Sequence, residues 1–137
     1  PKTVVVVVNN DVWTSTDGGN NWTAVGIKEA FPLTYPRGIM VKPDSPNTIF
    51  VTIGDSTPGR TGAIMRSTDT GKTWQSMKLS TPSNTAMWVV STHRENPQVM
   101  FAGSRYGDLY RSDDGGNSWE KQWREFSEIS SVLSIPG

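Results

Sequence analysis

The side chains of this 137-residue chain that could do chemistry stand in polar loops between short apolar segments. Two carboxyl groups at the right separation can cleave a glycosidic bond, and the carboxylates available for this are Glu29, Asp55, Asp108 and Glu128. Arginine can clamp a carboxylate or phosphate, and tyrosine can stack on a sugar or peptide. The residues of these types in the same loops are Tyr35, Arg37, Arg60, Arg105 and Tyr106. Because loops on a stiff scaffold concentrate function, they form the candidate site.

Composition narrows the kinds of partner and site. There is no cysteine and a single histidine, His93, so we expect no metal site, and no motif implies a cofactor. The 13 basic and 13 acidic residues balance, which predicts no attraction to nucleic acid or to an anionic membrane. The longest apolar run, Val4–Val8, is too short to span a bilayer, and no signal peptide is recognisable. We therefore expect a soluble protein of unassigned compartment.

One tract, Ser-x-Asp-x-Gly-x-Asn/Thr/Ser-Trp, occurs three times, at 15–22, 67–74 and 112–119. An interval of about 50 residues is typical of a repeat architecture. Each tract predicts a tight turn in which the aspartate accepts backbone N–H groups, the glycine adopts a positive φ and the tryptophan packs beneath. The residues with these structural roles are Asp17, Gly19, Trp22, Asp69, Gly71, Trp74, Asp114, Gly116 and Trp119.

Strand-like segments flank each tract in a constant order, which we name A to D from the innermost outward. In the second copy they are 37–43, 48–54, 62–67 and 73–79. Four antiparallel strands per repeat predict a propeller blade. We expect one all-β propeller segment over 1–137, with blade 2 at 37–79 and blade 3 at 86–124. Blade 1 takes strands B to D from 1–27 and its A strand from 128–135.

This strand order predicts how the propeller closes. Propellers have four to eight blades, so three blades cannot form a ring alone. We predict that two chains form a six-bladed ring, a homodimer closed by strand exchange, in which the last strand of each chain completes the first blade of the other. The alternative is that the chain is a fragment of a longer propeller. A lone chain would expose an apolar strand edge at 3–8, which is an aggregation hazard.

The three tracts resemble the Asp-box, or BNR repeat, of sialidases, sortilin-type receptors, xyloglucan hydrolases and photosystem assembly factors. The chain is also similar to uncharacterised bacterial propellers with these repeats, because 41–51 and 103–112 look like their A–B and B–C hairpins. The resemblance implies a β-propeller but no single function, since this fold hosts hydrolases, receptors and assembly factors. It also implies a structural role for the aspartates, because Asp-boxes lie away from the catalytic centres of sialidases.

The sequence contains no reaction-specific spacing of nucleophile and base. We therefore predict a non-enzymatic scaffold that binds a protein, peptide or glycan on the face made by the D–A and B–C loops. The alternative is a glycoside hydrolase or sialidase-like enzyme, or a fragment of one. In that case two of the four loop carboxylates must come about 5–5.5 Å apart for retention of configuration, or about 6.5–9.5 Å apart for inversion.

Overall fold

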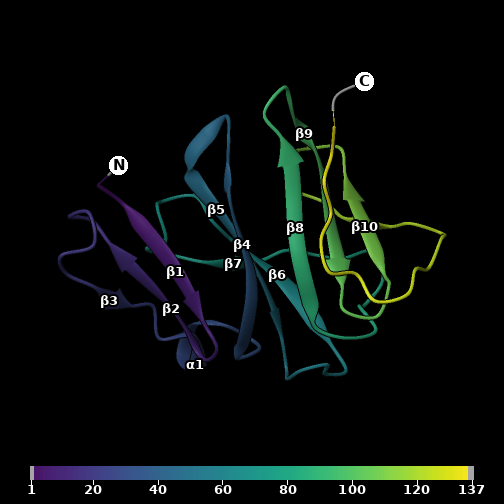
Figure 1. Cartoon of the computed structure of the whole chain (residues 1–137), viewed down its shortest axis with the longest axis horizontal. Helices are drawn as coiled ribbons and strands as arrows, with labels where there is room; N and C mark the ends of the chain where they lie inside the picture. Colours follow the sequence, from purple (N-terminus) through teal and green to yellow (C-terminus); the bar gives the residue numbers. More distant parts are fainter. Residues whose placement is uncertain (1, 136–137) are drawn as a thin grey trace.

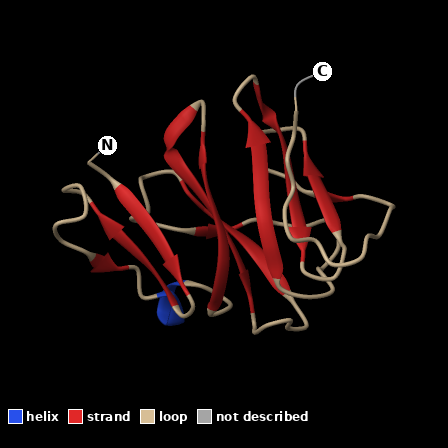
Figure 2. Cartoon of the chain, viewed as in Figure 1, coloured by secondary structure: helices blue, strands red, loops and turns tan. Residues whose placement is uncertain are grey.

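Three antiparallel β-sheets stand side by side and contain nearly all the regular structure of the protein (Figures 1 and 2). The structure, a computed structural model, describes residues 2–135. The first sheet consists of β1 (Val4–Val8), β2 (Asp11–Ser15) and β3 (Thr23–Ala24), and the one-turn helix α1 (Ile27–Ala30) follows it. No helix in this range is long and apolar enough to cross a membrane. Apart from α1, the all-β prediction is confirmed.

The second and third sheets are four-stranded and have the predicted A-to-D order. The second sheet consists of β4 (Tyr35–Lys42), β5 (Ser45–Gly54), β6 (Gly62–Ser67) and β7 (Gln75–Ser76). The third consists of β8 (Met87–His93), β9 (Asn96–Ser104), β10 (Leu109–Ser112) and β11 (Glu120–Lys121). The outermost strands are shorter than predicted. The chain leaves the second sheet after β7, because Leu79 forms a bridge with Trp119 of the third sheet.

The predicted A strand at 128–135 is not a strand in this structure. Ile129 donates its N–H to the carbonyl of Arg105 at 3.2 Å, and the segment then runs along the third sheet beside β8 (Figure 1). A β-strand needs a backbone partner on a neighbouring strand. The predicted partner, β1, lies at the opposite end of the three-sheet array, so this segment has no strand to pair with inside one chain (Figure 1).

Two apolar cores separate the three sheets. Alternate residues of a strand point to opposite faces of its sheet, so β5 serves both cores. Ile49, Val51 and Ile53 join the core against the first sheet, whereas Phe50 joins the core against the third. All four side chains are almost fully buried. Burial on both faces explains why residues 49–53 of β5 are apolar except for Thr52.

The three repeated tracts fold into the same hairpin turn. The serine hydroxyl accepts the glycine N–H at 2.8 Å in all three, for the pairs Ser15–Gly19, Ser67–Gly71 and Ser112–Gly116. The aspartate Oδ1 accepts the N–H of the residue before the tryptophan at 2.9–3.0 Å, for the pairs Asp17–Asn21, Asp69–Thr73 and Asp114–Ser118. Each indole N–H donates to the glycine carbonyl at 2.9–3.1 Å. The glycines have φ between 85° and 95°.

Candidate functional site

Aromatic and cationic side chains converge where the inner strands β4 and β8 begin. The guanidinium carbon of Arg37 lies 4.0 Å from the ring centre of Trp88 and 5.3 Å from that of Tyr35. Arg37 Nη1 also donates to the Tyr35 hydroxyl at 3.2 Å. The guanidinium of Arg105, at the end of β9, lies 4.8 Å from the same Trp88 ring. A cation within about 6 Å of an aromatic ring centre is attracted to the ring face, so Trp88 holds both arginines together.

A glycine lets the two inner strands approach closely enough to form this cluster. A Cβ added at Gly38 would stand 2.9 Å from the carbonyl oxygen of Trp88 and 2.8 Å from Thr52 Oγ1. The Gly38 N–H donates to that hydroxyl at 2.7 Å. Any side chain at this position would push β8 away from β4. Gly38 therefore sets the distance at which Arg37 meets the Trp88 ring.

The outer guanidinium of the cluster is paired with a carboxylate. Arg105 Nη2 lies 2.9 Å from Glu128 Oε2, and the side chain of Glu128 is more than half exposed. This pair connects the cluster to the segment that follows β11. The structure thus brings Tyr35, Arg37, Arg105 and Glu128 of the predicted site residues into one group around Trp88, which carries two arginines against one carboxylate.

Asp55 is occupied in shaping its own loop between β5 and β6. Its Oδ1 accepts the backbone N–H groups of Arg60 at 2.9 Å, Ser56 at 3.1 Å and Thr61 at 3.4 Å. The hydrogen bond from Arg60 contributes most to holding the pKa of Asp55 below its usual value. The exposed side chain of Arg60 is carried on this loop.

Asp108 is buried beneath the loop between β9 and β10. Its Oδ2 accepts the backbone N–H of Asn84 at 2.9 Å, and its Oδ1 lies 2.8 Å from Lys121 Nζ. The hydrogen bond to Asp108, and then that to Glu125, raises the pKa of Lys121. A buried carboxylate is stable only when it is paired and hydrogen-bonded, and here both conditions are met. No local signal identifies Lys121 or Asn84 as its partners, since neither is near it in the chain.

The remaining predicted residues stand apart from this cluster or expose their side chains to solvent. Glu29 is exposed on α1, and Tyr106 is 48 % exposed at the tip of the β9–β10 loop. No three metal-ligating side chains within residues 2–135 form a group that could hold an ion. The four predicted carboxylates therefore belong to four local structures: a helix, a loop staple, a buried ion pair and an exposed ion pair.

One protein-family model matches most of the chain. The family model described as "Sortilin, neurotensin receptor 3" matches residues 10–131. The chain belongs to the Sortilin-Vps10 family. This match and the three antiparallel sheets agree with the predicted β-propeller class.

The curated proteins and solved structures that resemble the chain include xyloglucanases. A xyloglucanase of Paenibacillus is 26 % identical over 125 residues, covering 82 % of this chain and 11 % of the relative. The GH74 enzyme of Niastella koreensis has a TM-score of 0.70 at 21 % identity, over 88 % of this chain and 20 % of that structure. YCF48 of Cyanidioschyzon merolae has a TM-score of 0.61 at 23 % identity, over 88 % and 36 %. The chain thus spans about a tenth of the xyloglucanase and shares the propeller fold of both structures.

Proposed function

We propose that the chain is a propeller segment of a xyloglucanase-type glycoside hydrolase and that its loop face binds the glucan substrate. The relatives favour this alternative over the non-enzymatic scaffold, since those named for an activity are xyloglucanases. We also infer that the three repeated turns are Asp-boxes. Their shared hydrogen bonds support this, as does their use of every aspartate within its own turn.

The observation that carries the proposal is the cluster around Trp88. Apolar C–H faces of a sugar pack on aromatic rings, while its hydroxyl oxygens accept hydrogen bonds from guanidinium groups. Tyr35, Arg37 and Arg105 present both kinds of group beside the Trp88 ring. Tyr106 adds an exposed ring on the loop that follows Arg105. Such a surface suits a polysaccharide chain that lies across several blades.

The surroundings of the loop carboxylates support the proposal that this segment binds the glucan but does not cleave it. Oδ1 of Asp55 accepts three backbone N–H groups of its own loop, and Asp108 is buried against Lys121. Glu128 is paired with Arg105. A glycosidase needs two carboxyl groups facing one bond across a defined gap. In the proposal, therefore, the acid and base lie outside this segment.

The test is calorimetric titration of the 137-residue chain with xyloglucan oligosaccharides, using two exposed aromatic residues as a matched pair. Tyr106→Ala removes a ring from the proposed binding face, and we expect a loss of about 1 kcal/mol, roughly fivefold in Kd. Trp22→Ala removes an exposed ring from a repeated turn and leaves Kd unchanged. Equal weakening by both changes, or no saturable binding by the unaltered chain, refutes the proposal.

A reducing-sugar assay tests separately whether this segment also cleaves the glucan. We expect the chain alone to release no product from xyloglucan above the buffer background. Hydrolysis that disappears in both Asp55→Asn and Asp108→Asn would show that the catalytic pair lies in these loops, and would leave the binding result intact.

One observation favours the competing scaffold function. The exposed Glu128 carboxylate on Arg105 occupies the place that an acidic side chain of a peptide would take. If a Glu-rich peptide binds more tightly to the Glu128→Gln variant than to the unaltered chain, while xyloglucan oligosaccharides bind to neither, the loop face is a peptide-binding surface.

A further inference from the structure

The three sheets correspond residue by residue through their strand registers. Val4 in β1, Ile49 in β5 and Met100 in β9 each pair with the serine that opens the turn of the same sheet. Counting along the strands from these pairs, Val6 corresponds to Val51 and Val8 to Ile53. On the neighbouring strands, Trp13 corresponds to Met65 by the same count.

These equivalent positions are buried in the second sheet and exposed in the first. Val51, Ile53 and Met65 are at most 2 % exposed, because the first sheet covers them. Their counterparts on the outer face of the first sheet, Val6, Val8 and Trp13, are 37–38 % exposed. The first sheet therefore carries, on its free face, the apolar side chains that a preceding blade buries elsewhere in the molecule.

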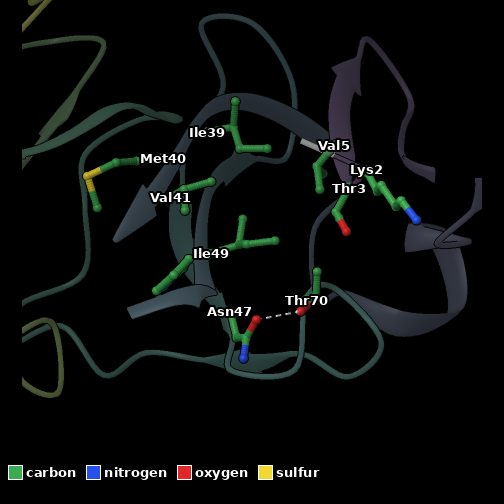
Figure 3. A pocket seen from close by; sticks show the side chains of 10 residues that line it. Lys2, Thr3, Val5, Ile39, Met40, Val41, Asn47, Ile49 and Thr70 are labelled. Carbon is green, nitrogen blue, oxygen red and sulfur yellow. Dashed lines mark hydrogen bonds between the residues drawn. The ribbon is translucent and has the colours of Figure 1, made fainter. Parts of the chain in front are cut away.

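An open groove follows the inner edge of β1. In the other two sheets β4 and β8 occupy the corresponding place, whereas β1 pairs only with β2 among the described strands. A cavity of about 530 Å³ lies between the first and second sheets, and Val5 of β1 faces Ile39 and Val41 of β4 across it (Figure 3). Ile39 and Val41 are both exposed. Among residues 2–135 the groove has no inner strand, and no apolar side chain fills this cavity.

The segment after β11 has the features of such an inner strand. Its Ile129 N–H donates to the carbonyl of Arg105 in the loop between β9 and β10, and the N–H of Ala86, before β8, donates to the carbonyl of Pro58 in the loop between β5 and β6. Ile129 is buried against Gly103 and Val89. Ile129 and Val132 are three residues apart, as are the inward-facing residues of β8, Met87 and Val90. The segment thus lies along the third sheet, and the spacing of its apolar residues matches that in β8.

This equivalence sets the pairing that the segment would make with β1. Val90 pairs with Ala102 and Ser91 with Phe101, and by the register above Ala102 corresponds to Val6 and Phe101 to Val5. Val132 would therefore lie opposite Val6, and Leu133 opposite Val5. Leu133 is 79 % exposed in the single chain. In this register its side chain enters the cavity between Val5, Ile39 and Val41.

We infer that the groove along β1 binds residues 129–135 of a second copy of this chain. The exchange is reciprocal, since the same operation places the first copy's segment on the partner's β1, and the pair closes by two-fold symmetry. The backbone of β1 gains a paired strand, and the outer faces of the first and third sheets cover one another. This inference is independent of what the loop face binds.

The first experiment is the mass of the 137-residue chain by size exclusion with light scattering at about 100 µM. We expect twice the 15.1 kDa of one chain. Leu133→Asp places a charge against the apolar side chains of Val5, Ile39 and Val41 and should give the single-chain mass with an unchanged circular dichroism spectrum, because Leu133 contacts little in the single chain. The matched control is Trp123→Asp. Trp123 is 88 % exposed and corresponds to Lys78, which stays exposed between the second and third sheets, so this variant should remain a dimer.

A disulfide test checks the register in which residues 129–135 pair with β1. The sequence contains no cysteine, so the introduced cysteines can form disulfides only with one another. The double variant Val5→Cys/Leu133→Cys should oxidise to a covalent dimer on a non-reducing gel, because residues opposite one another on paired strands are close enough for a disulfide. Val5→Cys/Trp123→Cys should not do so. A single-chain mass for the unaltered protein overturns the inference. A dimer that survives Leu133→Asp and gives no specific disulfide also overturns it, because it is then held by another surface.

Discussion

The repeated turns of the first and third sheets are built alike but lie in different surroundings. In both, the indole N–H donates to the glycine carbonyl and the aspartate accepts the N–H of the residue before the tryptophan. Yet Trp119 is 1 % exposed and packs edge-on against Phe50 at 6.3 Å, whereas Trp22 is 40 % exposed. The difference teaches that the local sequence builds the turn and a neighbouring sheet buries it. The hydrogen bonds of the turn therefore form whether or not another sheet covers it.

The largest effect on the free energy of unfolding should come from replacing the buried turn tryptophan, and the exposed one gives the comparison. We expect Trp119→Ala to lower the free energy of unfolding by about 3–5 kcal/mol, as for a buried aromatic residue. Trp22→Ala should cost about 1 kcal/mol, close to the value of one hydrogen bond. Urea unfolding of both changes in the Leu133→Asp background removes any contribution from a second copy. Similar losses for both would contradict the view that burial, and not the turn, gives Trp119 its importance.

The turn glycines offer a second comparison at a smaller scale. Gly19 has a φ of 95° and Gly116 a φ of 90°. An alanine at either position should therefore lower the free energy of unfolding by about 1–2 kcal/mol through backbone strain. At Gly116 the new Cβ would also stand 2.5 Å from the Phe50 ring, while at Gly19 the nearest atom belongs to Trp22 at 3.5 Å. Overpacking should add about 1–3 kcal/mol at Gly116 alone. Thermal unfolding of the two variants tests this, and equal costs would show that the ring moves freely.

Acid titration should affect all three turns in the same direction. A side-chain hydrogen bond from Thr73 lowers the pKa of Asp69 to about 2, and the backbone N–H of Asn21 does the same for Asp17. Burial works against the shift at Asp114, but hydrogen bonds from Ser118 outweigh it and its pKa is also about 2.

These values lie below the unfolded value of about 3.9, so the stabilisation is fully present above about pH 4. It is lost as the pH falls toward 2. Unfolding measured between pH 5 and 2 should be less pH-dependent in Asp17→Asn and Asp69→Asn than in the unaltered chain. A change in one variant only would mean that the turns are not electrostatically equivalent.

The smallest effect concerns the residue before the tryptophan. Asn21 donates from its side-chain amide to Asp17 Oδ2 at 2.7 Å, and the Ser118 hydroxyl does the same to Asp114 at 2.6 Å. Asn21→Ser should therefore change the free energy of unfolding by less than about 0.5 kcal/mol, as is usual for exposed positions. A larger loss in urea unfolding would show that the amide has a role in the first turn that the hydroxyl does not have in the third.

Much of the fold could be predicted because its signals are local. Turn residues such as Asp69 and Gly71 act within a few positions of themselves, and β-branched runs such as 48–53 mark strands without help from distant segments. The outermost strands were predicted too long because their ends depend on the next sheet, as the bridge between Leu79 and Trp119 shows. The strand predicted at 128–135 is not formed in the single chain for a related reason, since a strand exists only where a partner does.

The candidate site was less predictable because its geometry is tertiary. Arg37 and Trp88 come from β4 and β8 and Arg105 from the turn after β9, and their meeting depends on the close approach of β8 to Gly38. Nothing in the sequence distinguishes Asp108, which is buried against Lys121, from Asp55, which staples an exposed loop. Residue type could nominate these side chains, but only packing decides which of them share a site.

Hydrogen exchange of β1 tests most directly whether the outer face of the first sheet is an interface. At about 100 µM, peptides covering Val4–Val8 should exchange at least about tenfold more slowly in the unaltered chain than in the Leu133→Asp variant, because a paired strand protects its amides. Peptides covering Ser45–Gly54, which are paired on both edges within one chain, should exchange alike in both. Equal exchange of Val4–Val8 in the two proteins would contradict the account.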